Sequence, residues 1–234
     1  MGLLADALDV VYPPLCLACD APVSAGHFCA TCELSVQRLE ADGCERCSEP
    51  GHHLKGRCER CRGRPVAFER AFAPFVHDGA LAKAIHRFKY EDKPELSRPL
   101  GEMLATSAKD FIAQSPAVVT PVPLHPSRYR ERKYDHATLL AAALARQSGL
   151  KLLDGALTRV RDTPRQVGLT DEQRVANVRD AFSAGAEAKG QSILLIDDVL
   201  TTGATAHAAA TTLLAAGATR VRVLTLARAV LRQT

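Results

Sequence analysis

All eight cysteines of this 234-residue chain lie in four Cys-x-x-Cys pairs. A two-residue gap lets both thiolates of a pair reach one ion from a tight turn, and two pairs complete a tetrahedral zinc site. A single pair can be a redox centre, but four in succession favour two structural zinc (Zn²⁺) sites, which have no coordination position open for a substrate. The predicted metal ligands are Cys16, Cys19, Cys29, Cys32, Cys44, Cys47, Cys58 and Cys61.

The spacing alone leaves the pairing open. A sequential assignment joins the first pair with the second and the third with the fourth. A crossed assignment joins the first with the third and the second with the fourth, and it stays open because the loops between pairs are shorter than those of most zinc ribbons. Since about 60 residues bury little apolar surface, we expect metal to supply most of the folding free energy of this segment.

Composition changes after Pro65, where cysteine disappears. We therefore predict a double zinc-ribbon module over residues 1–65 and a second domain over residues 66–234. The chain is 47% hydrophobic and 24% charged, which is typical of a globular protein and excludes general disorder. Its net charge of +4 permits an anionic ligand. Residues 1–65 carry 7 Lys/Arg against 9 Asp/Glu, which argues against the whole module as a DNA clamp, although residues 57–64 form a local arginine run.

No segment is predicted to cross a membrane. Residues 199–219 lack charge, but their threonines, glycines and His207 make them too polar for a membrane span. Residues 1–11 contain no Lys or Arg, unlike a secretory signal. We therefore expect a cytoplasmic protein, whose oligomeric state the sequence does not fix.

Strand and helix patterns alternate from Phe68 onward. Apolar residues recur at helical spacing over 81–88, 96–112, 137–145 and 205–216, and β-rich runs cover 68–76, 118–124, 152–160, 192–196 and 221–226. This alternation predicts an α/β fold with a central, mainly parallel sheet and helices on both faces. Ligands of such sheets bind beyond the carboxyl ends of the strands. The polar stretch over residues 161–180 is predicted to be a mobile lid.

The most informative stretch is ILLIDDVLTTGAT, residues 193–205. A buried strand leads into Asp197 and Asp198, and a Thr/Gly loop and a helix follow. Free backbone N–H groups at the helix start, threonine hydroxyls and the close approach that Gly203 permits all suit a phosphate group. The adjacent carboxylates suit vicinal sugar hydroxyls, a cation or a developing positive charge.

This stretch resembles the motif with which type I phosphoribosyltransferases bind phosphoribosyl pyrophosphate (PRPP). The chain also resembles the ComF/GntX family, which joins a Cys-rich zinc module to a phosphoribosyltransferase domain. The residues that carry this resemblance are PVPLHP at 121–126, the basic stretch at 128–133, residues 166–169, Arg174, Asn177 and Phe182. The resemblance covers essentially the whole chain. It departs where the family often has RGFNQA: residues 132–137 read RKYDHA, so that Asp135 and His136 replace two amides. Asp135 is also a suitable cap for the following helix.

The resemblance implies a type I phosphoribosyltransferase fold and roles for individual residues. Asp197 and Asp198 would be the catalytic acids, which contact the ribose hydroxyls directly or through Mg²⁺ and stabilise an oxocarbenium-like transition state. The 5′-phosphate would be held by Thr201, Thr202, Gly203, Ala204 and Thr205. The pyrophosphate would be held by residues chosen from Arg128, Arg130, Arg132 and Lys133, and the lid would supply Arg165, Gln166 and Arg174.

The function implied is Mg²⁺-dependent phosphoribosyl transfer from PRPP to an unidentified acceptor, in a family linked to DNA uptake during natural competence. Two alternatives stay open. One is a non-catalytic sensor of PRPP or a nucleotide. The other is a competence adaptor whose partner is single-stranded DNA or a protein of the competence machinery.

Overall fold

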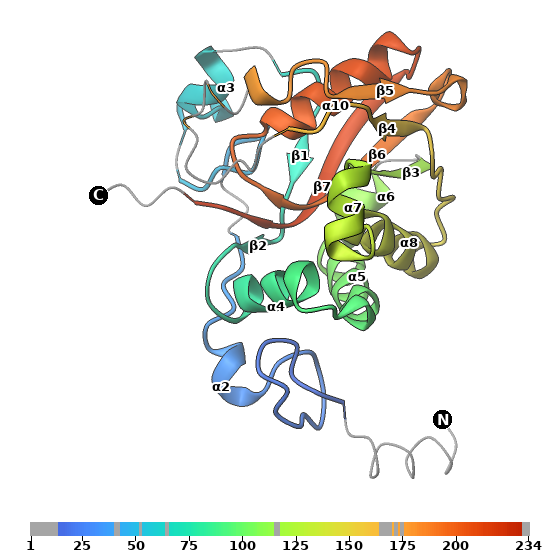
Figure 1. The fold of residues 1–234 in the computed structure, drawn as a ribbon. Helices are drawn as coiled ribbons and strands as arrows, with labels where there is room; N and C mark the ends of the chain where they lie inside the picture. The colour runs from blue at the N-terminus through green and yellow to red at the C-terminus, as the bar shows by residue number, and fades with distance from the viewer. Residues whose placement is uncertain are drawn as a thin grey trace.

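A parallel sheet forms the centre of the computed structural model, which describes residues 14–39, 43–51, 53–63, 66–114, 118–163, 170, 173 and 176–230. Its strand order is β1-β7-β6-β3, and β2 also pairs with β7 (Figure 1). Each of these pairings is parallel, as predicted. The strands are β1 (Ala71–Phe72), β2 (Phe75–Val76), β3 (Val118–Pro121), β6 (Ser192–Leu200) and β7 (Arg220–Arg228).

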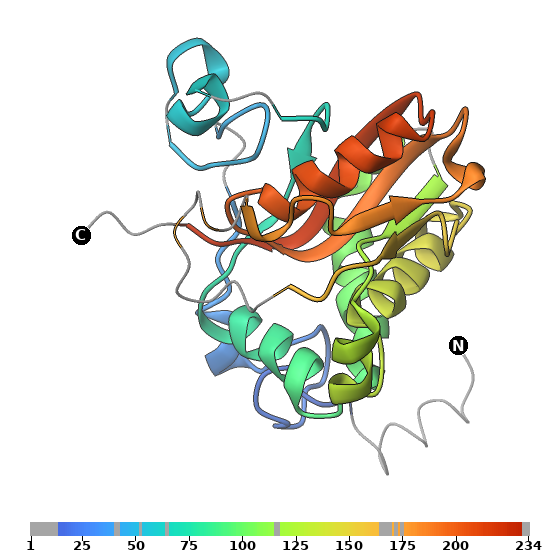
Figure 2. The ribbon, with the colours of Figure 1, turned by 45° about the horizontal axis from the view of Figure 1, so that its top comes forward.

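Helices cover both faces of the sheet, because β6 is apolar on both sides. Leu194 and Ile196 join the core cluster that contains residues of α4 (Gly79–Tyr90), α5 (Ser97–Ser107) and α8 (His136–Ser148). Ile193 and Leu195 join the cluster on the other face, with α10 (Ala204–Ala215). Successive strand residues point to opposite faces, so a continuous apolar run is buried on both faces of the sheet. Figures 1 and 2 show α10 separated from α5 and α8 by the sheet.

The apolar pattern over residues 96–112 is divided between several elements. They are η2 (Pro94–Leu96), α5 and α6 (Lys109–Ala113), and α6 starts where Ala108 leaves helical geometry at φ −108° and ψ 16°. The basic stretch after β3 forms a helix, α7 (Pro126–Arg132), with Pro126 in its first turn. The other short helices are α2 (Ala30–Glu33), η1 (Leu54–Gly56), α3 (Glu59–Gly63) and η3 (Ala186–Ala188).

The predicted strand at 152–160 does not run continuously along the sheet. Leu152 makes an isolated parallel bridge to Val119, and the chain then turns at Gly155, where φ is +85°. Strand β4 (Leu157–Arg159) pairs antiparallel with β5 (Phe182–Ala184) in a separate two-stranded sheet. The turn breaks the strand because a positive φ interrupts extended backbone. Half of the predicted lid, residues 164–169, 171–172 and 174–175, lies outside the described residues.

The two cysteine-rich segments contact different parts of the second domain. Around the first, Leu17 and Phe28 belong to the same apolar cluster as α4 and α5, and the Leu17 carbonyl accepts a hydrogen bond from Arg87 Nη1 at 2.9 Å. Around the second, the Arg46 carbonyl accepts a bond from the amide of Ala71 in β1 at 2.8 Å. Figure 2 shows α2 and α3 on opposite sides of the molecule. Across the described part of the chain, no helix has both the length and the apolarity that a bilayer crossing requires.

Candidate functional site

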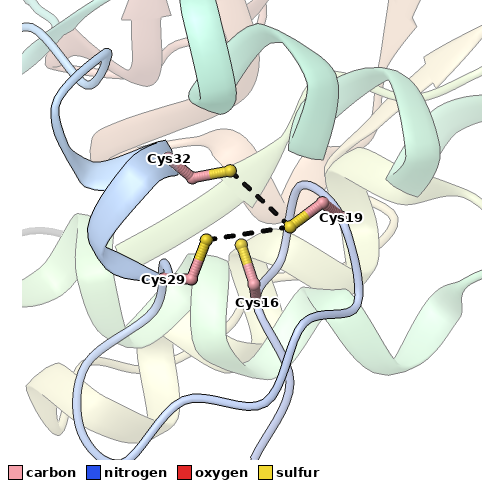
Figure 3. A group of neighbouring side chains, drawn as sticks. All are labelled: Cys16, Cys19, Cys29 and Cys32. Atoms are coloured by element: carbon pink, nitrogen blue, oxygen red, sulfur yellow. Dashed lines mark hydrogen bonds between the residues drawn. The ribbon is translucent and has the colours of Figure 1, made fainter.

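The cysteines form two groups of four with the sequential pairing, and the crossed alternative is wrong. Within each group the sulfur atoms lie within 4.8 Å of one another. In the first group, Cys19 Sγ lies 3.8 Å from Cys29 Sγ and 3.7 Å from Cys32 Sγ (Figure 3). Four sulfurs at about 2.3 Å from a tetrahedral zinc ion are about 3.8 Å apart. The geometry and the chemistry of the donor set therefore fit Zn²⁺.

The second group repeats this arrangement in a more buried place. Cys47 Sγ lies 3.7 Å from Cys58 Sγ, and Cys44 Sγ accepts a hydrogen bond from the amide of Cys58 at 3.3 Å. Cys44, Cys47 and Cys58 are each at most 5% exposed, and Cys61 packs against them. Four neighbouring thiols bury too little apolar surface to stabilise a segment unless they share a metal ion. This group too therefore has the features of a structural zinc site.

A separate cavity of about 410 Å³ opens at the carboxyl ends of β3 and β6. Its walls are the segment after β3, the start of α7, the end of α4, the chain around β4, and the loop that joins β6 to α10. This is the edge at which parallel sheets bind ligands. The predicted site residues that line it are Asp197, Asp198, Thr201, Gly203, Thr205, Arg128 and Arg132.

The β6–α10 loop ends in a backbone geometry that favours glycine. Gly203 caps α10 with φ +79°, and an added Cβ would make only ordinary contacts, the nearest at 3.7 Å from Phe68 Cζ. The glycine is therefore required by its φ and not by a lack of space. Thr202 Oγ1 accepts a hydrogen bond from the amide of Ala204 at 3.3 Å, so this threonine organises the loop. Neither Thr202 nor Ala204 lines the cavity.

The two acids lie inside strand β6, which is longer than the predicted 192–196. Its ladder with β7 continues past Ile196, with Asp197 opposite Thr225 and Leu200 opposite Arg228. Successive strand residues face opposite ways, so the two carboxylates have different surroundings. Asp197 Oδ1 accepts a hydrogen bond from the Asp198 amide at 2.9 Å, which holds the pair together.

Asp198 is 4% exposed and is held by a lysine and a histidine from distant parts of the chain. Its Oδ2 lies 2.6 Å from Lys89 Nζ, at the end of α4, and 2.9 Å from His136 Nε2, at the start of α8. Burial alone would raise the pKa of Asp198, but Lys89 and His136 outweigh it and hold that pKa well below its usual range. Asp197 has the opposite shift: burial and the neighbouring Asp198 charge raise its pKa to about 7.

His136 connects the acid pair to α7. Its Nδ1 lies 3.0 Å from Arg132 Nη1. A guanidinium has only N–H donors, so His136 Nδ1 accepts this bond and the ring hydrogen is on Nε2, facing Asp198. Arg132 also donates to the Tyr90 hydroxyl at 3.1 Å and lies over the Tyr90 ring, 4.8 Å from its centroid. The replacement of the family's amide by His136 thus places a neutral imidazole between a cavity arginine and a buried acid.

Asp135, the other departure from the family pattern, caps α8 as predicted. Its Oδ1 accepts hydrogen bonds from the amides of Ala137 and Thr138, at 2.9 and 3.1 Å. Its Oδ2 accepts a third from the Leu124 amide at 2.7 Å. The side chain therefore joins the segment after β3 to the helix that carries His136.

The predicted pyrophosphate residues separate into two groups. Arg128 and Arg132 line the cavity, and Arg128 Nη2 donates to the Thr163 carbonyl at 3.0 Å. Arg130 and Lys133 do not line it. Arg130 is exposed, and Lys133 ends α7 with φ +67° and pairs with Asp92 at the exposed surface. Three further predicted residues lie outside the described part of the chain: Arg165, Gln166 and Arg174.

Sequence reasoning missed several residues that line the cavity: Lys89, Tyr90, His136, Arg159, Asp162 and Thr225. A weak signal existed for Lys89, which lies four residues after the buried Ile85 and beside the buried Phe88, at the border of an apolar helix face. His136 was visible as a departure from the family pattern. Arg159 ends β4, and nothing in its sequence surroundings marks it; Asp162 lies in the stretch predicted to be a lid, but it was not singled out there.

Comparison with known proteins identifies both halves of the chain. Residues 7–62 match the family Double zinc ribbon domain, and residues 135–232 match the family Phosphoribosyl transferase domain. The DNA utilization protein YhgH of Escherichia coli K12 is 29% identical over 222 residues, which are 92% of this chain and 97% of that protein. Competence protein F of Haemophilus influenzae is 26% identical over 92% of this chain and 96% of that protein, and Competence protein ComFC of Bacillus subtilis is 25% identical over 88% and 91%.

A solved structure titled as the allosteric regulatory enzyme of purine biosynthesis aligns with 59% of this chain and 29% of its own, at 23% identity and a TM-score of 0.42. The two family matches cover the cysteine clusters and the Asp197–Thr205 loop respectively, and the parallel sheet agrees with the second of them. Together they show a double zinc ribbon followed by a phosphoribosyltransferase domain, and the named relatives are consistent with the ComF family.

Proposed function

We propose that the cavity binds PRPP and that the protein transfers the phosphoribosyl group to an acceptor with release of pyrophosphate. One observation carries this proposal: a glycine-capped helix start, two adjacent acids and two arginines line the same cavity. The helix start suits the 5′-phosphate, because its N–H groups and dipole favour an anion. Arg128 and Arg132 suit the pyrophosphate, because a guanidinium binds phosphate oxygens through paired hydrogen bonds.

Asp197 and Asp198 line the same cavity as these two anion subsites, and the ribose would lie beside them. Asp198 is too enclosed, and too firmly held by Lys89 and His136, to move freely. Asp197 is the more accessible of the two and is the better partner for the ribose hydroxyls. As the bond to pyrophosphate weakens, the anomeric carbon becomes positive, and an ionised Asp197 close to the ribose stabilises that charge.

Carboxylate oxygens are ligands that Mg²⁺ prefers, and carboxylate oxygens of Asp197 and Asp198 lie within 4.8 Å of each other. The two acids therefore fit Mg²⁺ bound together with PRPP. When bound, the ion would neutralise charge on the pyrophosphate. Arg128 and Arg132 would orient the same group from the side of α7.

The division into subsites can be tested with ligand fragments. Arg128→Met should weaken the binding of inorganic pyrophosphate at least tenfold and leave ribose 5-phosphate binding within twofold, as measured by calorimetry. Arg130→Met is the matched control, because Arg130 is exposed on the same helix and does not line the cavity. Equal loss of both fragments, or no loss of pyrophosphate, would contradict the assignment. Release of pyrophosphate from PRPP in the presence of acceptors would separate an enzyme from a sensor.

A second candidate function, a single-stranded-DNA adaptor, is favoured by the relatives named for DNA utilization and competence. Arg46, Arg57 and Arg70 surround a hollow beside the second cysteine group, but Glu45 and Glu69 line it too. This mixture of charges predicts weak, salt-sensitive binding. Absence of binding to single-stranded DNA at low salt would exclude this candidate.

A further inference from the structure

Lys89 reaches the acid pair from α4, an element that lies outside the region matching the phosphoribosyltransferase family. Its ammonium is 2.6 Å from Asp198 Oδ2, and its side chain is 19% exposed, at the wall of the cavity. Most of a lysine side chain is a flexible apolar stem, so the ammonium can be withdrawn without moving the helix. Lys89 is thus a mobile cation attached to a buried and fixed carboxylate.

Lys89 supplies the positive charge of this contact. The other partner of Asp198, His136, has Nδ1 occupied by a donor from Arg132 and is therefore a neutral imidazole. Arg159 also lines the cavity, but it lowers the pKa of Asp197 less than Lys89 does. The ammonium is therefore the main counter-ion of two carboxylates that would otherwise repel each other in a partly buried place.

A divalent cation that bound Asp198 through Oδ2 would compete with Lys89 for that oxygen. A carboxylate oxygen of Asp197 and one of Asp198 lie within 4.8 Å of each other, close enough to share one ion, and Asp198 Oδ2 is already in contact with Lys89 Nζ and His136 Nε2. Two cations cannot share that oxygen at contact distance without strong repulsion. Free Mg²⁺, which gives up its own water reluctantly, has to displace the ammonium to bind.

We propose that Lys89 is a built-in counter-ion that keeps free Mg²⁺ from the acid pair, and that the metal enters only with a ligand whose pyrophosphate draws the ammonium away. The second half of this statement rests on the proposed function; the first half does not. A pyrophosphate carries more negative charge than one carboxylate and lies in the same cavity, so it offers Lys89 a stronger partner. Lys89 would then bind the ligand while the metal takes its place at Asp198.

Metal binding without PRPP tests the first half. Mn²⁺, a paramagnetic substitute for Mg²⁺, is titrated into the zinc-loaded full chain and followed by electron paramagnetic resonance. We expect Lys89→Met to bind Mn²⁺ at least tenfold more tightly than wild type, and Lys89→Arg to stay within twofold of wild type. Lys83→Met is the control, because Lys83 is exposed on the same helix and does not line this cavity. Equal Mn²⁺ affinity of Lys89→Met and wild type would overturn the proposal.

A measurement on wild type keeps the test decisive if Lys89→Met does not fold. Acetic anhydride labels exposed lysines, and mass spectrometry gives the rate at each position. Lys89 should react much more slowly than Lys83, and Mg²⁺ alone at millimolar concentration should leave its rate unchanged. Release of Lys89 by Mg²⁺ alone would overturn the proposal.

Inorganic pyrophosphate with Mg²⁺ tests the second half. We expect this mixture, but not Mg²⁺ alone, to change the labelling rate of Lys89. If pyrophosphate does not bind at all, the proposed function fails while the result with Mn²⁺ alone still stands. If pyrophosphate binds and the Lys89 rate does not change, the exchange of the ammonium for the metal is refuted.

Discussion

Replacing Asp197 by Asn should stabilise the ligand-free protein, and more so as the pH rises. The amide keeps an oxygen for the hydrogen bond from the Asp198 amide but removes the second carboxylate. Burial and the Asp198 charge raise the pKa of Asp197 to about 7 in the folded protein. The pKa of an unfolded aspartate is about 3.9. The wild type therefore takes up a proton on folding between these two values and becomes less stable as the pH rises through this window.

The size of the effect follows from the same pKa shift. One pKa unit corresponds to about 1.4 kcal/mol. Between pH 5 and pH 8 the wild type should lose about 2.5 kcal/mol relative to a variant in which this group cannot ionise, and above pH 8 the loss should level off. Asp198 adds nothing in this range, because its pKa is held well below the usual value.

Urea denaturation of zinc-loaded protein in Mg²⁺-free buffer, at pH 5, 6, 7 and 8, measures this difference. Asp162→Asn is the matched control: Asp162 also lines the cavity, but the hydrogen bond from Ser127 lowers its pKa, so it should show no dependence over this range. A difference between Asp197→Asn and wild type that does not grow with pH would refute the account of the acid pair. A confirmed difference would mean that the acids are retained at a cost in stability, as functional groups commonly are.

Three further predictions concern a zinc site, a buried ion pair and the backbone at Gly203. Cys44→Ser should reduce the zinc content from two ions to one per chain, as counted by atomic emission, and an unchanged content would contradict the site. Glu49→Ala should destabilise the protein by about 3 kcal/mol in urea denaturation, because it leaves the buried Arg228, which is 1% exposed, without its carboxylate partner. Glu102→Ala, which breaks an exposed ion pair with Arg98, should cost less than about 0.5 kcal/mol. Equal losses in the two variants would refute the role of the buried pair. Gly203→Ala should lower the free energy of unfolding by about 1 kcal/mol, because alanine is strained at a φ of +79°. An unchanged free energy of unfolding would contradict this explanation.

The sequence predicted those parts of the fold that local patterns determine. The four cysteine pairs, the parallel sheet and the helices over residues 81–88 and 205–216 follow from spacing and apolar periodicity, and the structure confirms them. The pairing of the cysteine groups could not be read, because it depends on how the chain folds back and not on the spacing. The extent of β6 was underestimated because acids rarely continue a buried strand; here the ladder with β7 carries the chain past them.

The candidate site was predictable where one motif holds it together and not where distant segments meet. The acids and the Thr/Gly loop are consecutive in the sequence, so strand and loop geometry place them together. Lys89 is more than a hundred residues away, and its contact with Asp198 depends on the packing of α4. Lys133 looked equivalent to its arginine neighbours, but the end of α7 turns it towards Asp92. A run of basic residues indicates which side chains could bind an anion, but the position of each residue around the helix decides which of them face the cavity.

The most direct test of the central claim is Mg²⁺-dependent PRPP binding, measured by calorimetry on zinc-loaded wild type and on the Asp197→Asn/Asp198→Asn variant. The account predicts binding by wild type and at least a hundredfold loss in the variant, with zinc content and folding unchanged. Unchanged PRPP affinity in the folded variant would contradict the role of the acid pair. A lack of binding by folded, zinc-loaded wild type would contradict the proposed function itself.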